Sequence, residues 1–221
     1  KNKKMSLKEN YYIKQIDYNT AMDIIVKNHY LHRKAPCSIA FGLFENSDYK
    51  INIFESGRIV GVIVYGVSCS STLLRGICGD DESKNVYELT RLWIEDSTPK
   101  NAESFLIGNT IKKLDKEIIV SFAEIEAGHS GIVYQATNFY YCGLSAKFKD
   151  VLVKGMENKH HASYAHGMSI NEIKQKYGEE NIYYKDRSRK HRYIYFNATK
   201  KRKTELLSKL KYKIQQYPKN N

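Results

Sequence analysis

The sequence predicts an α/β protein whose core is built around a central mixed β-sheet flanked by helices. Between residues 86 and 143, short β-branched runs alternate with helical patterns, and this order places helices on the faces of a sheet. A two-stranded pattern precedes this region and further strand-like runs follow it. The length of 221 residues suits one domain, because domains usually contain about 100 to 200 residues. We therefore expect a single domain over residues 1–221 with its core at about 19–197.

The first expected elements are a helix and a hairpin. Asn19 or Thr20 can cap a short helix with apolar residues from 21 to 26, which leads into a polar turn with two histidines. The runs 51–54 and 58–65 flank a Glu-Ser-Gly turn and predict two antiparallel strands. We expect a loop in the following segment, which ends at residue 85 and is rich in Ser, Gly and Asp.

A strand and a capped helix are expected next. The strand covers residues 86–94, and Thr98 and Pro99 follow it as an N-cap and a first helical residue. The apolar spacing of four and three predicts one buried helix face, formed by Ile107, Ile111 and Leu114.

A buried strand at 118–123 then ends at a Gly-His-Ser-Gly break, which precedes a helix through residues 134–140. The remaining elements are less regular. We expect strands at 148–153 and 193–197, a short helix at 170–177 and a basic terminal helix at 204–216.

The net charge of +12 is concentrated near the C-terminus. The segment 187–219 carries twelve Lys or Arg residues against Glu205 alone, a net charge of +11. Such a segment attracts a polyanion, and interleaved tyrosines add stacking surfaces, so nucleic acid is the expected partner. The alternative is a solvated, lysine-rich tail.

Cysteine spacing and hydropathy point to a cytosolic protein. The four cysteines form no C-x-x-C pair, and no run approaches the roughly 18 apolar residues of a membrane helix. No signal segment is recognisable at the start. We expect reduced thiols and no membrane association.

Four segments resemble the Mom family of phage adenine-modification proteins. They are ELTRL at 88–92, PKNAESF at 99–105, SFAE at 121–124 and GHSGIVYQATNF at 128–139. Weaker matches are His29-Tyr30, residues 190–193 and residues 217–219. The resemblance implies a GNAT acyltransferase-like fold, acetyl-CoA and iron as cofactors, and a carbamoylmethyl group on N6 of adenine in double-stranded DNA. That product hides restriction sites, which implies the cytoplasm of an infected or lysogenic bacterial host.

The resemblance also implies catalytic residues. Arg91 lies inside an apolar strand and Glu124 ends the next strand, where α/β folds often place chemistry. Tyr134 can protonate a leaving thiolate, and Tyr30 joins this set. Structural alternatives remain, because Arg91 can simply pair with Glu88 or Glu124, and Tyr134 can be a core residue.

The cofactor is expected at the helix that follows Pro99, because first-turn amides bind pyrophosphate. The usual glycine-rich loop of the superfamily is absent. The expected cofactor-binding residues are Thr98, Lys100, Asn101, Ser104 and Asn138.

The implied chemistry favours a redox metal and a flipped base. A carbamoylmethyl group is joined through its methylene carbon, which simple general-base catalysis does not achieve, and a purine amine inside a duplex is inaccessible. The candidate iron ligands His29, Glu124 and His129 form no recognised local motif. His160, His161 and His166 are expected to be surface residues.

The basic segment supplies the expected phosphate contacts. These are Arg187, Arg189, Lys190, His191, Arg192, Lys201 and Arg202. Two other functions remain open: a conventional GNAT N-acetyltransferase acting on RNA or protein, and a DNA-binding module without catalysis.

Overall fold

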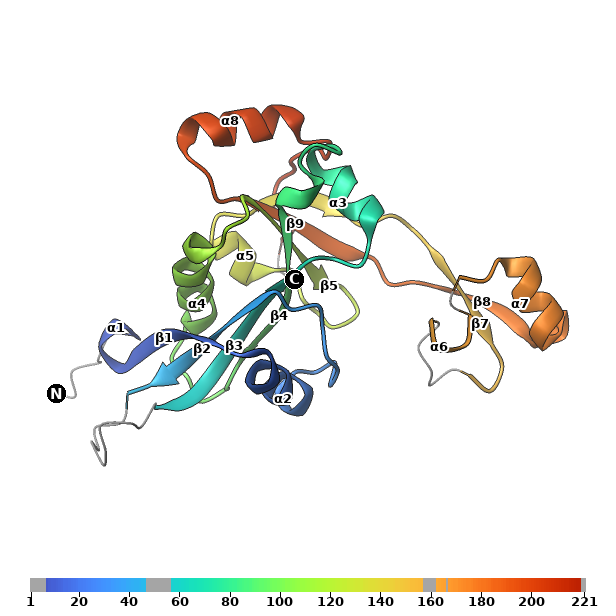
Figure 1. Cartoon of the computed structure of the whole chain (residues 1–221), viewed down its shortest axis with the longest axis horizontal. Coiled ribbons are helices and arrows are strands. Elements are labelled where there is room, and N and C mark those ends of the chain that lie inside the picture. Colours follow the sequence, from blue (N-terminus) through green and yellow to red (C-terminus); the bar gives the residue numbers. More distant parts are fainter. Residues whose placement is uncertain (1–6, 47–56, 157–161, 166, 220–221) are drawn as a thin grey trace.

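A seven-stranded sheet forms the centre of the protein in a computed structural model, which describes residues 7–46, 57–156, 162–165 and 167–219. The strand order is β1-β2-β3-β4-β5-β9-β6 (Figure 1). Its strands are β1 (Tyr11–Ile16), β2 (Ile39–Glu45), β3 (Arg58–Gly66), β4 (Val86–Ile94), β5 (Ile118–Glu124), β6 (Tyr140–Leu144) and β9 (Lys190–Phe196).

Helices cover both faces of this sheet. Helices α4 (Ala102–Thr110) and α5 (Ile132–Ala136) pack on the face that carries Ile63 and Ile119. The other face carries α2 (Tyr18–Asn28), α3 (Ser71–Cys78) and α8 (Lys200–Lys209). A short α1 (Leu7–Asn10) precedes β1, and 3-10 turns lie at Ser83–Asn85, Ile111–Lys113 and Glu179–Asn181.

The sheet is mixed, as the sequence predicts. Only β4 and β5 are parallel, and every other neighbouring pair is antiparallel. The expected order of strand, helix, strand and helix is confirmed as β4, α4, β5 and α5. The α/β class with a central mixed sheet flanked by helices is therefore correct.

The parallel pair separates after three residues. Pairing of β4 with β5 ends at Glu88 and Val120, while β4 remains paired with β3 to Ile94 and β5 remains paired with β9 to Glu124. Each strand follows its outer neighbour, so a gap opens between them. Ligands in α/β proteins bind at such openings beyond the carboxyl ends of strands.

In the N-terminal half, strands β1 and β2 were not expected from the hydrophobic pattern. β3 confirms the strand at 58–65, but its neighbours are β2 and β4. The other proposed hairpin strand, at 51–54, lies outside the described residues. The helix near residue 20 is present as α2, but its cap is Asp17, which accepts a hydrogen bond from the Thr20 amide, and not Asn19 or Thr20.

The expected loop before residue 85 is wrong in part, because α3 occupies it. Ser70 caps this helix by accepting from the Leu73 amide, and Gly79 ends it with φ of 103°. Ile77 and Cys78 are buried against Leu206 of α8. The pattern did not reveal this helix, because its eight residues contain few apolar positions and the surrounding segment is rich in Ser, Gly and Asp.

Two further boundaries differ from expectation. α5 covers Ile132–Ala136 and Tyr140 begins β6, so the helix predicted through 134–140 ends four residues earlier than expected. The terminal helix is α8, which starts at Lys200 under a Thr199 cap and ends at Lys209. The following residues run back over the sheet edge, where the Gln215 amide donates to the Tyr141 carbonyl.

An arm projects from the domain beyond β6 and β9 (Figure 1). It consists of β7 (Lys149–Val153) and β8 (Ile182–Asp186), paired antiparallel, with α6 (Ala162–Ala165) and α7 (Ile170–Tyr177). Val153 and Ile173 lie in a small core of its own. The expected strand at 148–153 and helix at 170–177 are both confirmed here.

The basic C-terminal segment is not an appendage. Its first part forms β9, which lies between β5 and β6 in the sheet, and its second part forms α8. No helix found in the described residues has the length and apolar character to cross a membrane.

Candidate active site between strands β4 and β5

A cavity of about 710 Å³ fills the gap between the diverging strands. Residues of β4 and the end of β5 form its walls, and the α2–β2 connection and the start of α5 close it. A bulge in β4 contributes to this shape, since the pairing shifts between Val64 and Tyr65 and leaves Thr90 without a direct partner. Bulges re-aim neighbouring side chains, and they are common beside active sites.

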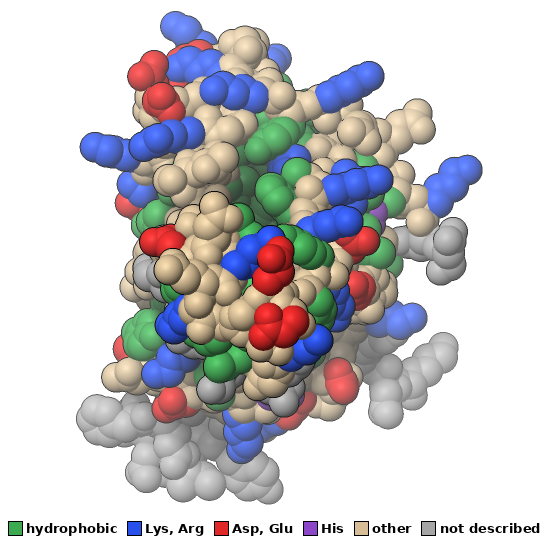
Figure 2. Space-filling view, turned by 90° about the vertical axis from the view of Figure 1, so that its right-hand side faces the viewer, with side chains coloured by type: hydrophobic (Ala, Val, Ile, Leu, Met, Phe, Trp, Pro, Cys, Tyr) green, Lys and Arg blue, Asp and Glu red, His purple; other side chains and the backbone are tan. Residues whose placement is uncertain are grey.

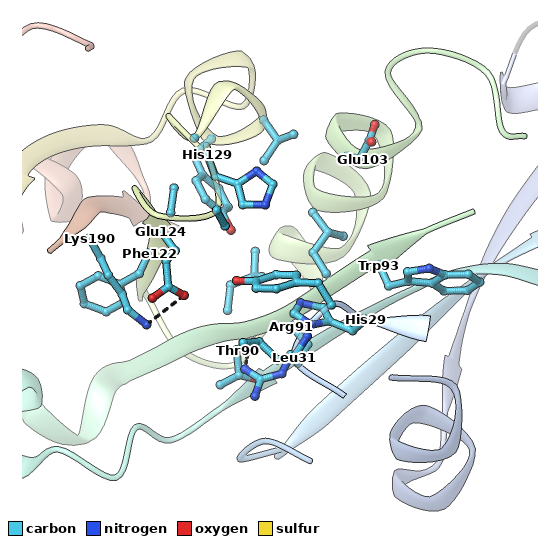
Figure 3. A pocket seen from close by; sticks show the side chains of 18 of the residues that line it. His29, Leu31, Thr90, Arg91, Trp93, Glu103, Phe122, Glu124, His129 and Lys190 are labelled. Atoms are coloured by element: carbon cyan, nitrogen blue, oxygen red, sulfur yellow. Dashed lines mark hydrogen bonds and ion pairs between the residues drawn. The ribbon is translucent and has the colours of Figure 1, made fainter. Parts of the chain in front are cut away.

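All four residues predicted to be catalytic line this cavity. Arg91, Glu124, Tyr134 and Tyr30 come from β4, β5, α5 and the segment after α2. In Figure 3, Glu124 lies on one side of the cavity, His129 above it, and Arg91 and His29 below. The fold thus brings together residues that are up to 104 positions apart in the chain, from 30 to 134.

Arg91 is half-buried, and no carboxylate of the described residues forms an ion pair with it. Its guanidinium donates to the carbonyl oxygens of Thr90 at 2.6 Å and Lys34 at 3.4 Å, and its buried Nε has no hydrogen-bond partner. Burial, together with the nearby charge of Arg33, lowers its pKa. Among the described residues no ion pair to Glu88 or Glu124 forms, so the structural alternative for Arg91 is not supported.

Glu124 lies at the end of β5 and is directly opposite Lys190 in the β5–β9 register. The Lys190 Nζ is 3.7 Å from Glu124 Oε2, and both side chains line the cavity. Lys190 was predicted to contact DNA phosphate, whereas the sheet turns it toward this carboxylate. The sequence could have indicated the pair only if the register of β5 and β9 were known.

Tyr134 is a buried residue that also faces the cavity. Its ring packs against Phe139 and Tyr193, so part of its role is structural. Burial raises the pKa of its hydroxyl to about 12, although a hydrogen bond with Ser121 opposes this shift. The hydroxyl therefore keeps its proton at neutral pH and can donate it.

Three aromatic rings follow one another at the cavity mouth. Tyr30 stacks on His29 at 4.4 Å and lies 5.7 Å from His129. Tyr30 is 53% exposed, whereas His29 is 7% exposed. Burial and the charge of Arg91 lower the pKa of His29 to about 4, and its Nδ1 accepts from the Leu31 amide.

The predicted iron ligands share the cavity but do not form a metal site. Among the described residues no group of three His, Cys, Asp or Glu side chains lies close enough to hold a metal ion. The Nδ1 of His29 is used by the Leu31 amide and Glu124 is paired with Lys190. The prediction of iron held by His29, Glu124 and His129 is therefore not supported. His160, His161 and His166 lie outside the described residues.

The residues predicted to bind the cofactor are divided by the fold. Asn101, Ser104 and Asn138 line a second cavity of about 520 Å³ between α4 and α5, whereas Thr98 and Lys100 line neither cavity. Thr98 does not cap the helix, because its hydroxyl donates to the Glu95 carbonyl. The N-cap is Asn101, with a left-handed φ of 73°, and Pro99 lies outside the helix.

The predicted DNA contacts fall into three groups. Arg187 and Arg189 are at the root of the arm, where Arg187 pairs with Asp150 and Arg189 donates to the Ser145 carbonyl. His191 and Arg192 pack within the sheet region, against the rings of Tyr141 and Tyr212. On α8, Lys201 is exposed, but Arg202 is held by Glu82, Glu117 and Glu205. Most of these charges thus have partners within the protein.

Solved structures with a similar fold include an acetyltransferase and a complex with acetyl-CoA. An N-acetyltransferase from Staphylococcus aureus is 11% identical, with a TM-score of 0.44 and coverage of 85% of this chain and 97% of that chain. The Arabidopsis thaliana protein NAA60 in complex with acetyl-CoA is 8% identical, with a TM-score of 0.47 and coverage of 84% and 99%.

Sequence comparison gives a more specific result. The methylcarbamoylase Mom of Escherichia phage Mu is 28% identical over 212 residues, which cover 90% of this chain and 80% of that protein. The profile of the Mom protein family matches residues 10–219. This match includes the cavity residues of β4, β5 and α5 and nearly the whole described chain, and the chain therefore belongs to the Mom protein family.

Proposed function

We propose that this protein attaches a carbamoylmethyl-type group to N6 of adenine in double-stranded DNA and so protects phage DNA from host restriction. Membership of the Mom family and the likeness to the phage Mu methylcarbamoylase support this class of activity. One observation carries the proposal at the level of the site. Arg91, Glu124 and Tyr134 belong to three separate family-like motifs, yet they face one cavity.

The cavity mouth suits a base that has left the duplex. Enzymes that modify a base must take it out of the stack, and they hold it by stacking and by polar contacts. The exposed ring of Tyr30, supported from behind by His29, offers a stacking surface for adenine. The uncompensated charge of Arg91 deeper in the site binds an anionic or carbonyl group.

Proton transfer is assigned to Glu124 and Tyr134. The Glu124 carboxylate accepts the proton that leaves the N6 amine, and Lys190 at 3.7 Å keeps this carboxylate oriented. Tyr134 keeps its hydroxyl proton at neutral pH, because burial raises its pKa to about 12, and it would donate this proton to the CoA thiolate once the C–S bond breaks. The carbamoylmethyl group is joined through its methylene carbon, so attack on a thioester carbonyl does not form this bond. No step is therefore assigned beyond base binding and proton transfer.

The described residues fit an acyl-CoA in two respects. The edge of β4 beyond Glu88 faces the gap without a strand partner in the described chain, so its backbone groups can bond the two amides of a pantetheine arm as an added strand would. The cavity beside Asn101 and Asn138 can take the nucleotide end. When bound, an acyl-CoA supplies an activated two-carbon acyl group.

Nucleoside mass spectrometry tests the proposed activity. DNA from cells that express the protein should contain a modified adenosine, and Glu124→Gln should remove it. Glu124→Asp should retain part of the activity, because it keeps the carboxylate. Glu126→Gln is the matched control, since Glu126 is exposed on the same loop and lines neither cavity.

Two other outcomes would reject the proposal. Unmodified DNA together with acetylated RNA or protein would identify a conventional N-acetyltransferase. Unmodified DNA with no acetylated product, from a protein that still binds DNA, would identify a binding module.

Calorimetry tests the cofactor assignment. Acetyl-CoA should bind saturably, and Asn101→Gly should weaken binding without strain, because glycine tolerates the left-handed φ of 73° at this position. Lys100→Ala should bind normally, since Lys100 is exposed outside both cavities. No heat at millimolar acetyl-CoA from folded protein would exclude the assignment.

A further inference from the structure

The arm starts at the cavity wall, although only Lys190, at its base, lines the cavity among the described residues of the arm. Lys190 is the first residue of β9 and lines the cavity, and its amide donates to the Ser145 hydroxyl where the chain leaves β6 for the arm. The Ser145 amide in turn donates to the Lys190 carbonyl. Whatever binds the root of the arm therefore lies beside the cavity.

Charge is distributed unevenly along the arm. We define the arm base as residues 147–150 and 185–190, and the arm tip as residues 170–181. The arm base contains six Lys or Arg residues and two aspartates, a net charge of +4, whereas the arm tip contains two lysines and three glutamates. Figure 2 looks onto the end of the arm, where acidic and basic side chains mix, while Lys and Arg predominate on the surface above it.

In the described part of the chain, α6 and α7 both pack against one face of the β7–β8 ribbon. Val153 and Ile182 are paired and point to the side where α7 packs. Side chains alternate along a strand, so Phe148, Lys185 and Arg187 point to the opposite side. Phe148 is 58% exposed, and the Arg187 guanidinium lies 5.9 Å from the centre of its ring. Exposed cations and an aromatic ring together are typical of nucleic-acid surfaces.

We propose that the arm base is the docking surface for duplex DNA and that it holds the duplex backbone beside the cavity mouth. This inference rests on the proposed function, because DNA is the substrate there. The net charge of +4 at the arm base complements the phosphates, and a two-stranded ribbon is narrow enough to lie along the major groove. The arm tip lacks this charge and stays outside the contact.

The proposal separates the two halves of the basic C-terminal segment. Arg202 on α8 is fully engaged with three glutamates, so it is not a phosphate contact. Lys147 and Lys185 of the arm base are exposed, and the described chain places no carboxylate within ion-pair distance of either lysine. These two lysines were not among the residues predicted to bind DNA.

The test compares two double variants by DNA affinity at several salt concentrations, with a fluorescent 30-base-pair duplex as the probe. Lys147→Ala with Lys185→Ala removes two charges from the arm base. Lys174→Ala with Lys176→Ala removes two from the arm tip and is the matched control. At 0.1 M salt, the base variant should bind the duplex at least about tenfold more weakly than the wild type. The slope of log K against the logarithm of the salt concentration should become shallower by about two units. The tip variant should match the wild type.

Three results would overturn the docking surface: equal affinity and slope in the base variant and the wild type, equal losses in both variants, or tighter binding of single-stranded RNA than of the duplex. Thermal unfolding confirms that the variants are folded. Nucleoside mass spectrometry keeps the two proposals apart. If adenine is modified but the base variant binds DNA as the wild type does, only the docking surface is rejected. If the base variant loses DNA affinity but no modified adenine is found with the wild type, only the proposed activity is rejected.

Discussion

Two partly buried arginines of this protein have opposite surroundings. Arg202 on α8 donates to Glu82 at 2.7 Å, Glu117 at 2.9 Å and Glu205 at 2.6 Å. Within the described chain, Arg91 on β4 donates only to backbone carbonyl oxygens, and its Nε has no hydrogen-bond partner there. The first charge is neutralised within the fold, and the second is not.

This difference indicates that Arg202 serves the fold, and it supports the proposed ligand role of Arg91. A buried ion pair whose partners are complete holds elements together, and removal of one member leaves an uncompensated charge. A charge that the fold leaves uncompensated weakens stability, and such groups concentrate at functional sites. Sequence alone does not separate the two, because it does not show which carboxylates lie beside each guanidinium.

Replacement of Arg91 should have the largest effect on activity. Arg91→Ala should reduce adenine modification about 1,000-fold, as expected when a preorganised charge is lost from an enclosed site. Nucleoside mass spectrometry measures this loss. Arg75→Ala is the control, since Arg75 is exposed on α3, outside both cavities. Normal adenine modification by Arg91→Ala would show that Arg91 has no role in the activity.

Replacement of Arg202 should have the largest effect on stability. Arg202→Ala leaves Glu82, which is 5% exposed, with Lys209 as its remaining ion-pair partner in the described chain. The free energy of unfolding should fall by about 3 kcal/mol, as measured by urea denaturation. Activity per folded molecule should stay normal. A change below 0.5 kcal/mol, roughly the value of a surface ion pair, would show that the network contributes little.

The pH dependence of stability sharpens the comparison. Burial alone raises the pKa of Glu82, but hydrogen bonds from Lys209, Arg202 and Asn85 outweigh it and hold the pKa at about 2. The folded pKa lies below the unfolded value, so this stabilisation is complete above about pH 5 and is lost as the pH falls toward 2. Between pH 6 and pH 3, Glu82→Gln should lose about 2 kcal/mol less stability than the wild type. Urea denaturation measures both proteins at both pH values. Equal losses of stability in Glu82→Gln and the wild type between pH 6 and pH 3 would contradict this.

The smallest effect concerns the stability of the Arg91 variant. Because Arg91 has no carboxylate to leave behind, Arg91→Ala should change the free energy of unfolding by less than about 1 kcal/mol. Thermal and urea unfolding measure it alongside Arg202→Ala. A large destabilisation by Arg91→Ala would mean that the two arginines have similar structural roles.

Much of the chain organisation could be read from the sequence. β4 and β5 were predicted almost to the residue, because their β-branched residues are buried between helices and leave little alternative. Arg91, Glu124 and Tyr134 could be placed on these elements by motif. The short α3 could not be found, because its apolar positions lie among Ser and Gly, and β1 and β2 depend on sheet neighbours that a local pattern does not specify.

The amino-acid sequence by itself determined the α/β class, the buried strands at the centre and the identity of the candidate site residues, because periodicity and residue type are properties of each local segment. Only the tertiary structure decided which of these residues meet. The split between β4 and β5 creates the cavity, and the β5–β9 register places Lys190 beside Glu124. The packing of α8 places Arg202 beside Glu82, Glu117 and Glu205, whereas Arg91 forms no ion pair within the described residues. Partners far apart in sequence are set by strand pairing and burial, which no single segment encodes.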